Sequence, residues 1–72
     1  MQITLKEIKT FIENRHNEKI KEIKINYIDN QTFIYFLSTN NICYNLELKE
    51  NNKIKYCETN NILNNYYLNQ EI

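Results

Sequence analysis

The sequence predicts an α+β fold in which an N-terminal helix packs on an antiparallel sheet of three to four strands, followed by a short C-terminal helix. Two features of the pattern support this class. Apolar residues recur with a helical period near the N-terminus and alternate with polar residues from about residue 23 onward. Short asparagine-rich pairs separate the alternating stretches, as hairpin turns do. No repeat or linker interrupts residues 1–72, so we expect one small domain.

The first element is expected to be a helix over about residues 4–18. Thr4 and Glu7 have the spacing of a capping box, in which each residue satisfies an unpaired amide of the first helical turn. Ile3 and Ile8 occupy the two positions of a hydrophobic staple around that cap. The apolar residues of the segment share one helical stripe, which consists of Leu5, Ile8, Phe11 and Ile12.

Alternating apolar and polar residues then predict strands around residues 23–27 and 42–48, each with one buried face. Residues 32–37 lie between them and are apolar on both sides, which is typical of an interior strand. A shorter fourth strand is expected over residues 53–58. These segments are close enough in sequence to form an antiparallel sheet.

The turns are expected at the pairs of Asn and Asp residues. Tight turns need residues at positive φ; the chain contains no Gly, and Asn tolerates this conformation better than most other residues. We therefore interpret the repeated pairs as turns rather than as binding residues. They are Asp29-Asn30, Asn40-Asn41, Asn51-Asn52 and Asn60-Asn61.

The loop between the last two strands can be chosen by side-chain parity. A two-residue loop at Asn51-Asn52 would set apolar residues of one strand against polar residues of the next. A three-residue loop over residues 50–52 instead opposes Leu48 to Ile54, and we prefer it. Cys43 and Cys57 would then lie diagonally at about 7–8 Å, too far apart for an unstrained disulfide.

The C-terminal segment, residues 62–72, is expected to form a short helix. Its apolar residues Ile62, Leu63, Tyr66 and Tyr67 share one helical stripe. A further strand is the alternative, because Tyr and Ile favour strands as well and the segment is short.

Composition and charge narrow the classes of function. Nine Lys plus Arg balance nine Asp plus Glu, so the chain lacks the basic excess typical of nucleic-acid binding. With no signal peptide, no apolar run of membrane-spanning length and two cysteines, the protein is expected to be soluble and cytoplasmic. The chain has no Gly, Pro, Ala, Val or Trp and is rich in Asn, Ile, Lys and Tyr, which indicates an AT-rich genome, such as that of a low-GC bacterium or its phage.

We expect no catalysis, no cofactor, no metal and no small-molecule substrate. His16 with Cys43 or Cys57 could form a nucleophile and base pair, but its place at a helix end favours a solvated histidine that complements the helix dipole. The cysteines are too few and too widely spaced for a zinc site and are expected to be half-buried. Asp29 is expected in a turn, and phosphate-binding glycine loops cannot form without Gly.

The most informative feature is a surplus of large apolar residues on residues 32–37. Phe33, Tyr35 and Leu37 point to one side of that strand, and Ile34 and Phe36 point to the other. If one helix covers only one face, the other set is left for the C-terminal helix, a partner or a second copy of the chain. We predict that partner-binding residues come from this strand and from the final segment: Phe33, Tyr35, Leu37, Tyr66 and Tyr67.

These features favour a small protein-binding module, such as a phage or mobile-element accessory protein that inhibits or adapts a host complex. In size, inferred origin and lack of catalytic residues, the chain is similar to phage-encoded inhibitors of CRISPR nucleases and other defence systems, a likeness of class that no sequence motif supports. A homodimer whose second copy completes the core is a further hypothesis.

An RNA- or DNA-binding domain is the alternative from a different class. The order helix, three strands, helix resembles that of double-stranded RNA-binding domains. The chain departs from that family, because it lacks a Lys-rich start to the last helix and interleaves Lys19, Lys21 and Lys24 with Glu18 and Glu22. A solvated charged surface is therefore the preferred interpretation of these residues.

Overall fold

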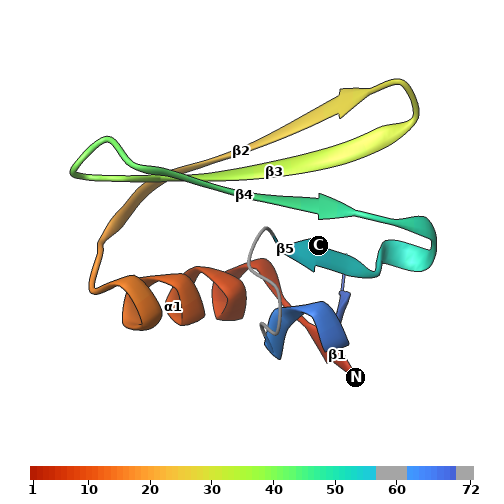
Figure 1. Ribbon diagram of the computed structural model, residues 1–72, viewed down its shortest axis with the longest axis horizontal. Helices are drawn as coiled ribbons and strands as arrows, with labels where there is room; N and C mark the ends of the chain where they lie inside the picture. Colours follow the sequence, from red (N-terminus) through yellow and green to blue (C-terminus); the bar gives the residue numbers. More distant parts are fainter. Residues whose placement is uncertain (57–61, 70–72) are drawn as a thin grey trace.

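The computed structural model describes residues 1–56 and 62–69 and has the predicted α+β fold, with one helix against a four-stranded antiparallel sheet (Figure 1). A two-stranded parallel pair, which the sequence did not predict, joins the beginning of the chain to its end. The elements in chain order are β1 (Gln2–Ile3), α1 (Leu5–His16), β2 (Ile20–Ile28), β3 (Gln31–Ser38), β4 (Cys43–Leu48), the 3₁₀ helix η1 (Glu50–Asn52), β5 (Ile54–Tyr56), the 3₁₀ helix η2 (Ile62–Asn65) and β6 (Tyr67–Leu68).

The helix α1 begins at the predicted capping box. The Glu7 amide donates to the Thr4 hydroxyl at 3.2 Å, and the Thr4 amide donates to the Glu7 carboxylate at 3.1 Å. The helix ends two residues before the predicted boundary, because Asn17 adopts a left-handed conformation with φ of 51°. Its amide donates to the Glu13 carbonyl and closes the last turn.

The four strands pair in the order β2-β3-β4-β5, each antiparallel to its neighbour. Leu48 pairs with Ile54 and Leu46 pairs with Tyr56, so the register predicted from parity is confirmed. The three-residue connection over residues 50–52 is the 3₁₀ helix η1, and the Lys49 amide closes it by donating to the Lys53 carbonyl at 2.8 Å.

The described residues with positive φ are all Asn or Asp. Asp29 and Asn30 form the two-residue turn between β2 and β3, with φ of 51° and 65°. Asn41 and the pair Asn51-Asn52 also have positive φ in turns, which confirms the interpretation of these pairs as turns. The expected turn at Asn60-Asn61 lies outside the described residues.

The core lies between α1 and the face of the sheet that carries Ile34 and Phe36, which we call the inner face. Ile8 and Ile12 of the helix are fully buried against it. In Figure 1, α1 runs along one part of this face and η2 with the β1–β6 pair lies nearer β5. The buried apolar residues form one cluster: Ile3, Ile8, Ile12, Ile20, Ile34, Phe36, Leu46, Leu48, Ile54, Tyr56, Leu63 and Leu68.

The predicted C-terminal helix is limited to the 3₁₀ helix η2, which covers four residues, followed by β6. Contacts with distant parts of the chain explain this difference. The side-chain carbonyl of Asn64 accepts from the Tyr56 amide at 2.7 Å, and the Tyr67 amide donates to the Met1 carbonyl at 2.9 Å. In a longer α-helix the Tyr67 amide would donate to the Leu63 carbonyl instead. Residues 70–72 of the expected helix lie outside the described part of the chain.

Candidate protein-binding surface

The outer face of the sheet, opposite α1, carries the apolar stripe of Phe33, Tyr35 and Leu37. Strand β3 buries Ile34, Phe36 and Ser38 on the inner face, so its odd-numbered side chains point the other way. Within residues 1–56 and 62–69, α1, η2 and the β1–β6 pair all contribute to the core on the inner face. No described element covers the outer face, and the three residues of the stripe are half-buried only by their neighbours in the sheet.

Polar residues of β2 and β4 flank this stripe on both sides. Tyr35 lies between Lys24 and Asn45, and Phe33 lies between Asn26 and Glu47, as the strand register places them. Lys24 also forms an exposed ion pair with Glu22 at 3.6 Å, and Glu47 is paired with Lys55 in register. The outer face is therefore an apolar stripe with a polar border of balanced charge.

The same face contains a shallow depression of about 330 Å³ beside the stripe. Phe33 and Tyr35 border it on the β3 side, and Lys55 and Tyr56 border it on the β5 side. Asn45 and Glu47 also line it. An apolar side chain of a partner could enter this depression and contact two aromatic rings of the stripe.

The other two predicted binding residues lie elsewhere. Tyr66 packs partly buried against the core, and Tyr67 lies in β6 with 37% of its surface exposed. Strand β6 pairs with β1, whose Ile3 belongs to the inner-face core. The structure thus brings Phe33, Tyr35 and Leu37 together and separates them from Tyr66 and Tyr67.

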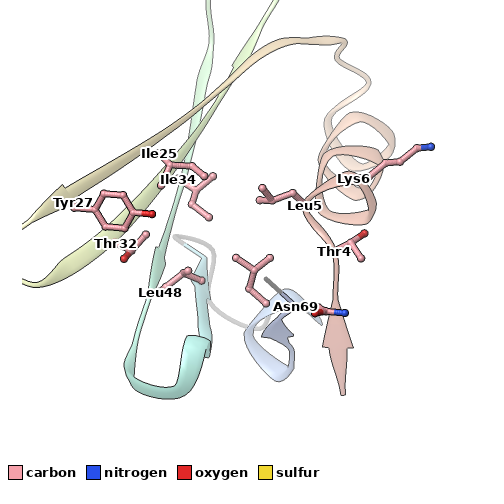
Figure 2. Close-up of a pocket in the computed structure, with 10 residues that line it drawn as sticks. Thr4, Leu5, Lys6, Ile25, Tyr27, Thr32, Ile34, Leu48 and Asn69 are labelled. Atoms are coloured by element: carbon pink, nitrogen blue, oxygen red, sulfur yellow. The ribbon is translucent and has the colours of Figure 1, made fainter. Parts of the chain in front are cut away.

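A second hollow lies on the inner face between the β2–β3 hairpin and the start of α1. Figure 2 shows Leu5 pointing toward Ile25 and Ile34 across this cleft, while the amine of Lys6 points away from it. Its volume is about 380 Å³, and most of its lining is apolar. The cleft offers an apolar side chain a place to enter.

Two residues near this cleft are exposed although their alternation indicates burial: Ile25 at 43% and Tyr27 at 76%. Alternation alone does not identify them as surface residues. A signal was available in the lengths of the elements: the 12 residues of α1 extend about 18 Å, whereas the nine residues of β2 extend about 30 Å. A helix of this length leaves part of the hairpin uncovered.

His16 is part of a half-buried aromatic cluster, so the expectation of a solvated histidine is wrong. Its ring stacks on Tyr44 with centroids 4.5 Å apart, and its Nε2 lies 3.2 Å from the Tyr56 hydroxyl. These partners belong to β4 and β5 and fix the end of α1 on the sheet. Burial, and secondarily the charge of Glu18, raise the pKa of Tyr44 above its usual value.

Cys43 is exposed, so the expectation that it is half-buried is also wrong. It lies on the outer face, and its thiol donates to the Asn45 side-chain carbonyl at 3.0 Å. His16 packs on Tyr44, which is on the inner face, and the sheet therefore separates it from Cys43. Cys57 lies outside the described residues. Among the residues that the structure describes, no group of three or more His, Cys, Asp or Glu residues is close enough to hold a metal ion.

No family model, curated protein or solved structure matches this chain. In the described part of the chain, no helix combines the length and apolar character needed to cross a membrane.

Proposed function

We propose that this protein is a non-catalytic protein-binding module that captures its partner through the outer face of the sheet. The observation that carries the proposal is the stripe of Phe33, Tyr35 and Leu37, which no described element covers. Large apolar side chains on an uncovered sheet face are a common feature of interfaces. Aromatic residues dominate the energy of such contacts when a partner buries them.

The chemistry of this face indicates a protein partner with an apolar or aromatic anchor residue. Such an anchor fits the depression beside Phe33 and Tyr35 and excludes water from both rings. The border supplies charges of both signs, with Lys24 beside Glu22 and Lys55 beside Glu47. A rim of this kind suits a mixed polar protein surface.

A nucleic-acid ligand is less well supported by the same residues. Phosphate backbones select clustered Lys and Arg, because binding depends on neutralising their charge. Beside the stripe, Lys24 and Lys55 each have a carboxylate neighbour on the same or the adjacent strand, Glu22 for Lys24 and Glu47 for Lys55. Measurable duplex or single-strand affinity that falls steeply with salt would favour this alternative instead.

We further propose that the partner is a component of a larger host complex, such as a defence nuclease. This part of the proposal comes from the small size, the AT-rich composition and the lack of a catalytic group, and it has no support from a relative. Affinity capture from a low-GC bacterial host, with wild-type protein as bait, tests it by the identity of the proteins retained.

The binding face is tested by three matched variants used as baits in the same capture. Tyr35→Glu places a charge in the middle of the stripe, and Tyr67→Glu places the same charge on β6. Asn45→Asp changes the border beside Tyr35 without removing apolar surface. Circular dichroism and a thermal melt establish that each bait is folded before capture.

We expect the Tyr35→Glu bait to lose the proteins that the wild-type bait retains and the Asn45→Asp bait to keep them. The response of Tyr67→Glu decides whether β6 takes part, since the two tyrosines lie on different parts of the molecule. Retention of all partners by folded Tyr35→Glu would refute the outer face as the binding surface.

A further inference from the structure

The strand β2 has a free hydrogen-bonding edge. In the described part of the chain it pairs only with β3, at the end of the strand order. The two-residue turn makes Ile28 and Gln31 a hydrogen-bonded pair, so Asn26 and Lys24 also direct their backbone groups to β3. The backbone N–H and C=O groups of Ile23, Ile25 and Tyr27 therefore point outward.

The side chains of these same three residues lie on the inner face, where Ile25 and Tyr27 are exposed. Long edge strands usually carry an inward-pointing charge, a proline or a bulge that prevents pairing. In β2 the irregularity is confined to the region between Ile20 and Glu22. The regular part, residues 22–28, has no inward-pointing charge and no proline.

We propose that β2 pairs antiparallel with β2 of a second copy of this chain, about a two-fold axis through Ile25. This residue is the midpoint of the regular part of the strand, so a register centred on it pairs the whole of residues 22–28. Ile25 then opposes its own copy, and Ile23 opposes Tyr27 of the second copy. Three hydrogen-bonded residue pairs form, with about six backbone hydrogen bonds. This inference is independent of the proposed outer-face function.

The charges of β2 select this register over its neighbours. Antiparallel pairing of outward-facing groups allows the axis to lie on any residue from Ile23 to Tyr27. An axis on Asn26 or Tyr27 shortens the paired segment to residues 24–28 or 26–28, because the turn begins at Asp29. An axis on Lys24 sets two lysines directly opposite each other, which is destabilising. An axis on Ile23 pairs Glu22 with Lys24 but leaves Tyr27 outside the contact. The Ile25 axis opposes Lys24 to Asn26, so it buries the exposed apolar residues without a like-charge contact.

The inner-face cleft fits this arrangement, because Ile25 and Tyr27 line it from the side of β2. In the pair, Tyr27 of the second copy lies beside Ile23 and adds apolar cover at that margin. A contact of one strand is smaller than the about 1,200 Å² at the lower end of stable interfaces. The dimer is therefore expected to form reversibly at micromolar concentrations.

Opposite charges at one position test the register. Asn26 is exposed on the outer face and opposes Lys24 of the second copy at two symmetric places. Asn26→Glu should lower the dimer dissociation constant by roughly 2- to 30-fold, and Asn26→Lys should raise it by a similar factor. The double variant Asn26→Lys with Lys24→Glu restores attraction and should recover dimerisation. Sedimentation velocity over a dilution series measures all four proteins.

Disulfide trapping provides a second measurement that does not depend on charge. The two native cysteines are first replaced by Ser. A mixture of Lys24→Cys chains and Asn26→Cys chains should then cross-link under mild oxidation. The reason is that these positions form a non-hydrogen-bonded pair between the two copies, with Cα atoms about 4.5 Å apart. Lys24→Cys alone should not cross-link. A chain that stays monomeric at all concentrations, equal effects of Asn26→Glu and Asn26→Lys, or cross-linking of Lys24→Cys alone would each overturn the proposal.

Discussion

The assignment of the two faces of β3 can be tested with two neighbouring residues. Phe36 is fully buried on the inner face, whereas Tyr35 lies half-buried on the outer face. Phe36→Ala should cost about 3–5 kcal/mol, the usual range for truncating a fully buried Phe. A 72-residue domain has a total stability of roughly 4–11 kcal/mol, so this loss amounts to between about a quarter and the whole of it.

Tyr35→Thr should have a much smaller effect. Thr favours strands as Tyr does, and Tyr35 has few apolar neighbours on the open outer face. The change removes on the order of 50 Å² of buried apolar surface, which corresponds to about 1 kcal/mol at about 25 cal/mol per Å². The two variants thus differ by about 2–4 kcal/mol although their positions are adjacent.

Urea denaturation followed by far-ultraviolet circular dichroism measures both variants, with Phe36→Leu as a milder change that should remain folded. A loss for Tyr35→Thr as large as that for Phe36→Ala would mean that the outer face is covered. It would refute the premise of the proposed binding surface. A loss below about 1 kcal/mol for Phe36→Ala would contradict the inner-face core instead.

Three further predictions concern the helix cap, the first turn and an alkaline transition. Thr4→Ala removes the acceptor for the Glu7 amide and should lower the free energy of unfolding by about 1 kcal/mol. Thr10→Ala in the same helix should raise it by about 0.5 kcal/mol, because Ala has the higher helix propensity. Thermal melts should show shifts of opposite sign. Asn30 has φ of 65°, so Asn30→Ala should cost about 1 kcal/mol while Asn30→Gly is neutral or stabilising in urea titrations. The pKa of Tyr44 is raised above 10.0 in the folded state, so the stability that this phenol contributes is fully present below pH 10.0 and is lost as pH rises through the folded pKa. Tyr44→Phe should therefore flatten the alkaline loss of unfolding free energy. An unchanged slope would contradict the raised pKa of Tyr44.

The parts of the fold that the sequence predicted well depend on interactions between near neighbours. The capping box joins Thr4 to Glu7 within one turn of helix, and both hydrogen bonds are present. The pairing of Leu48 with Ile54 follows from side-chain parity across a three-residue connection. In both cases the interacting residues are only a few positions apart in the sequence, so the local pattern is enough to choose between the alternative structures.

The C-terminal segment was harder to predict because its hydrogen bonds come from distant residues. Tyr and Ile favour helix and strand alike, so propensity could not decide between them. The amides of Tyr56 and Tyr67 bond to Asn64 and Met1, and these contacts limit the segment to a 3₁₀ helix and a short strand. Similarly, nothing near His16 in the sequence indicates that Tyr44 and Tyr56 will cover its ring.

The choice between the two faces of β3 was left open by the sequence for a related reason. Alternation separates Phe33, Tyr35 and Leu37 from Ile34 and Phe36, but it does not say which set the helix covers. The register with β2 and β4 settles this, because Ile34 lies between Ile25 and Leu46 and shares their face. The odd-numbered set is opposed by polar residues and is the one left open.

The two proposed surfaces can operate together, because β2 pairs through its backbone edge whereas the apolar stripe lies on the neighbouring strand β3, and only the border residues Lys24 and Asn26 adjoin both. Pairing through β2 would leave both apolar stripes on one side of a continuous sheet, with the two β3 strands about 14 Å apart. An immobilised partner at high density could then bind both stripes of one dimer, and dissociation would slow by avidity.

Ile25→Lys places its charge on the inner face and sets two lysines opposite each other across the axis, so it should speed dissociation from a dense partner surface while leaving the affinity for a single partner in solution unchanged. Tyr35→Glu should weaken both, since it changes the stripe itself. Surface plasmon resonance at two partner densities, together with calorimetry in solution, separates these effects. If Ile25→Lys weakened the solution affinity as much as Tyr35→Glu does, the edge and the face would belong to one binding site, and pairing between copies would compete with partner binding.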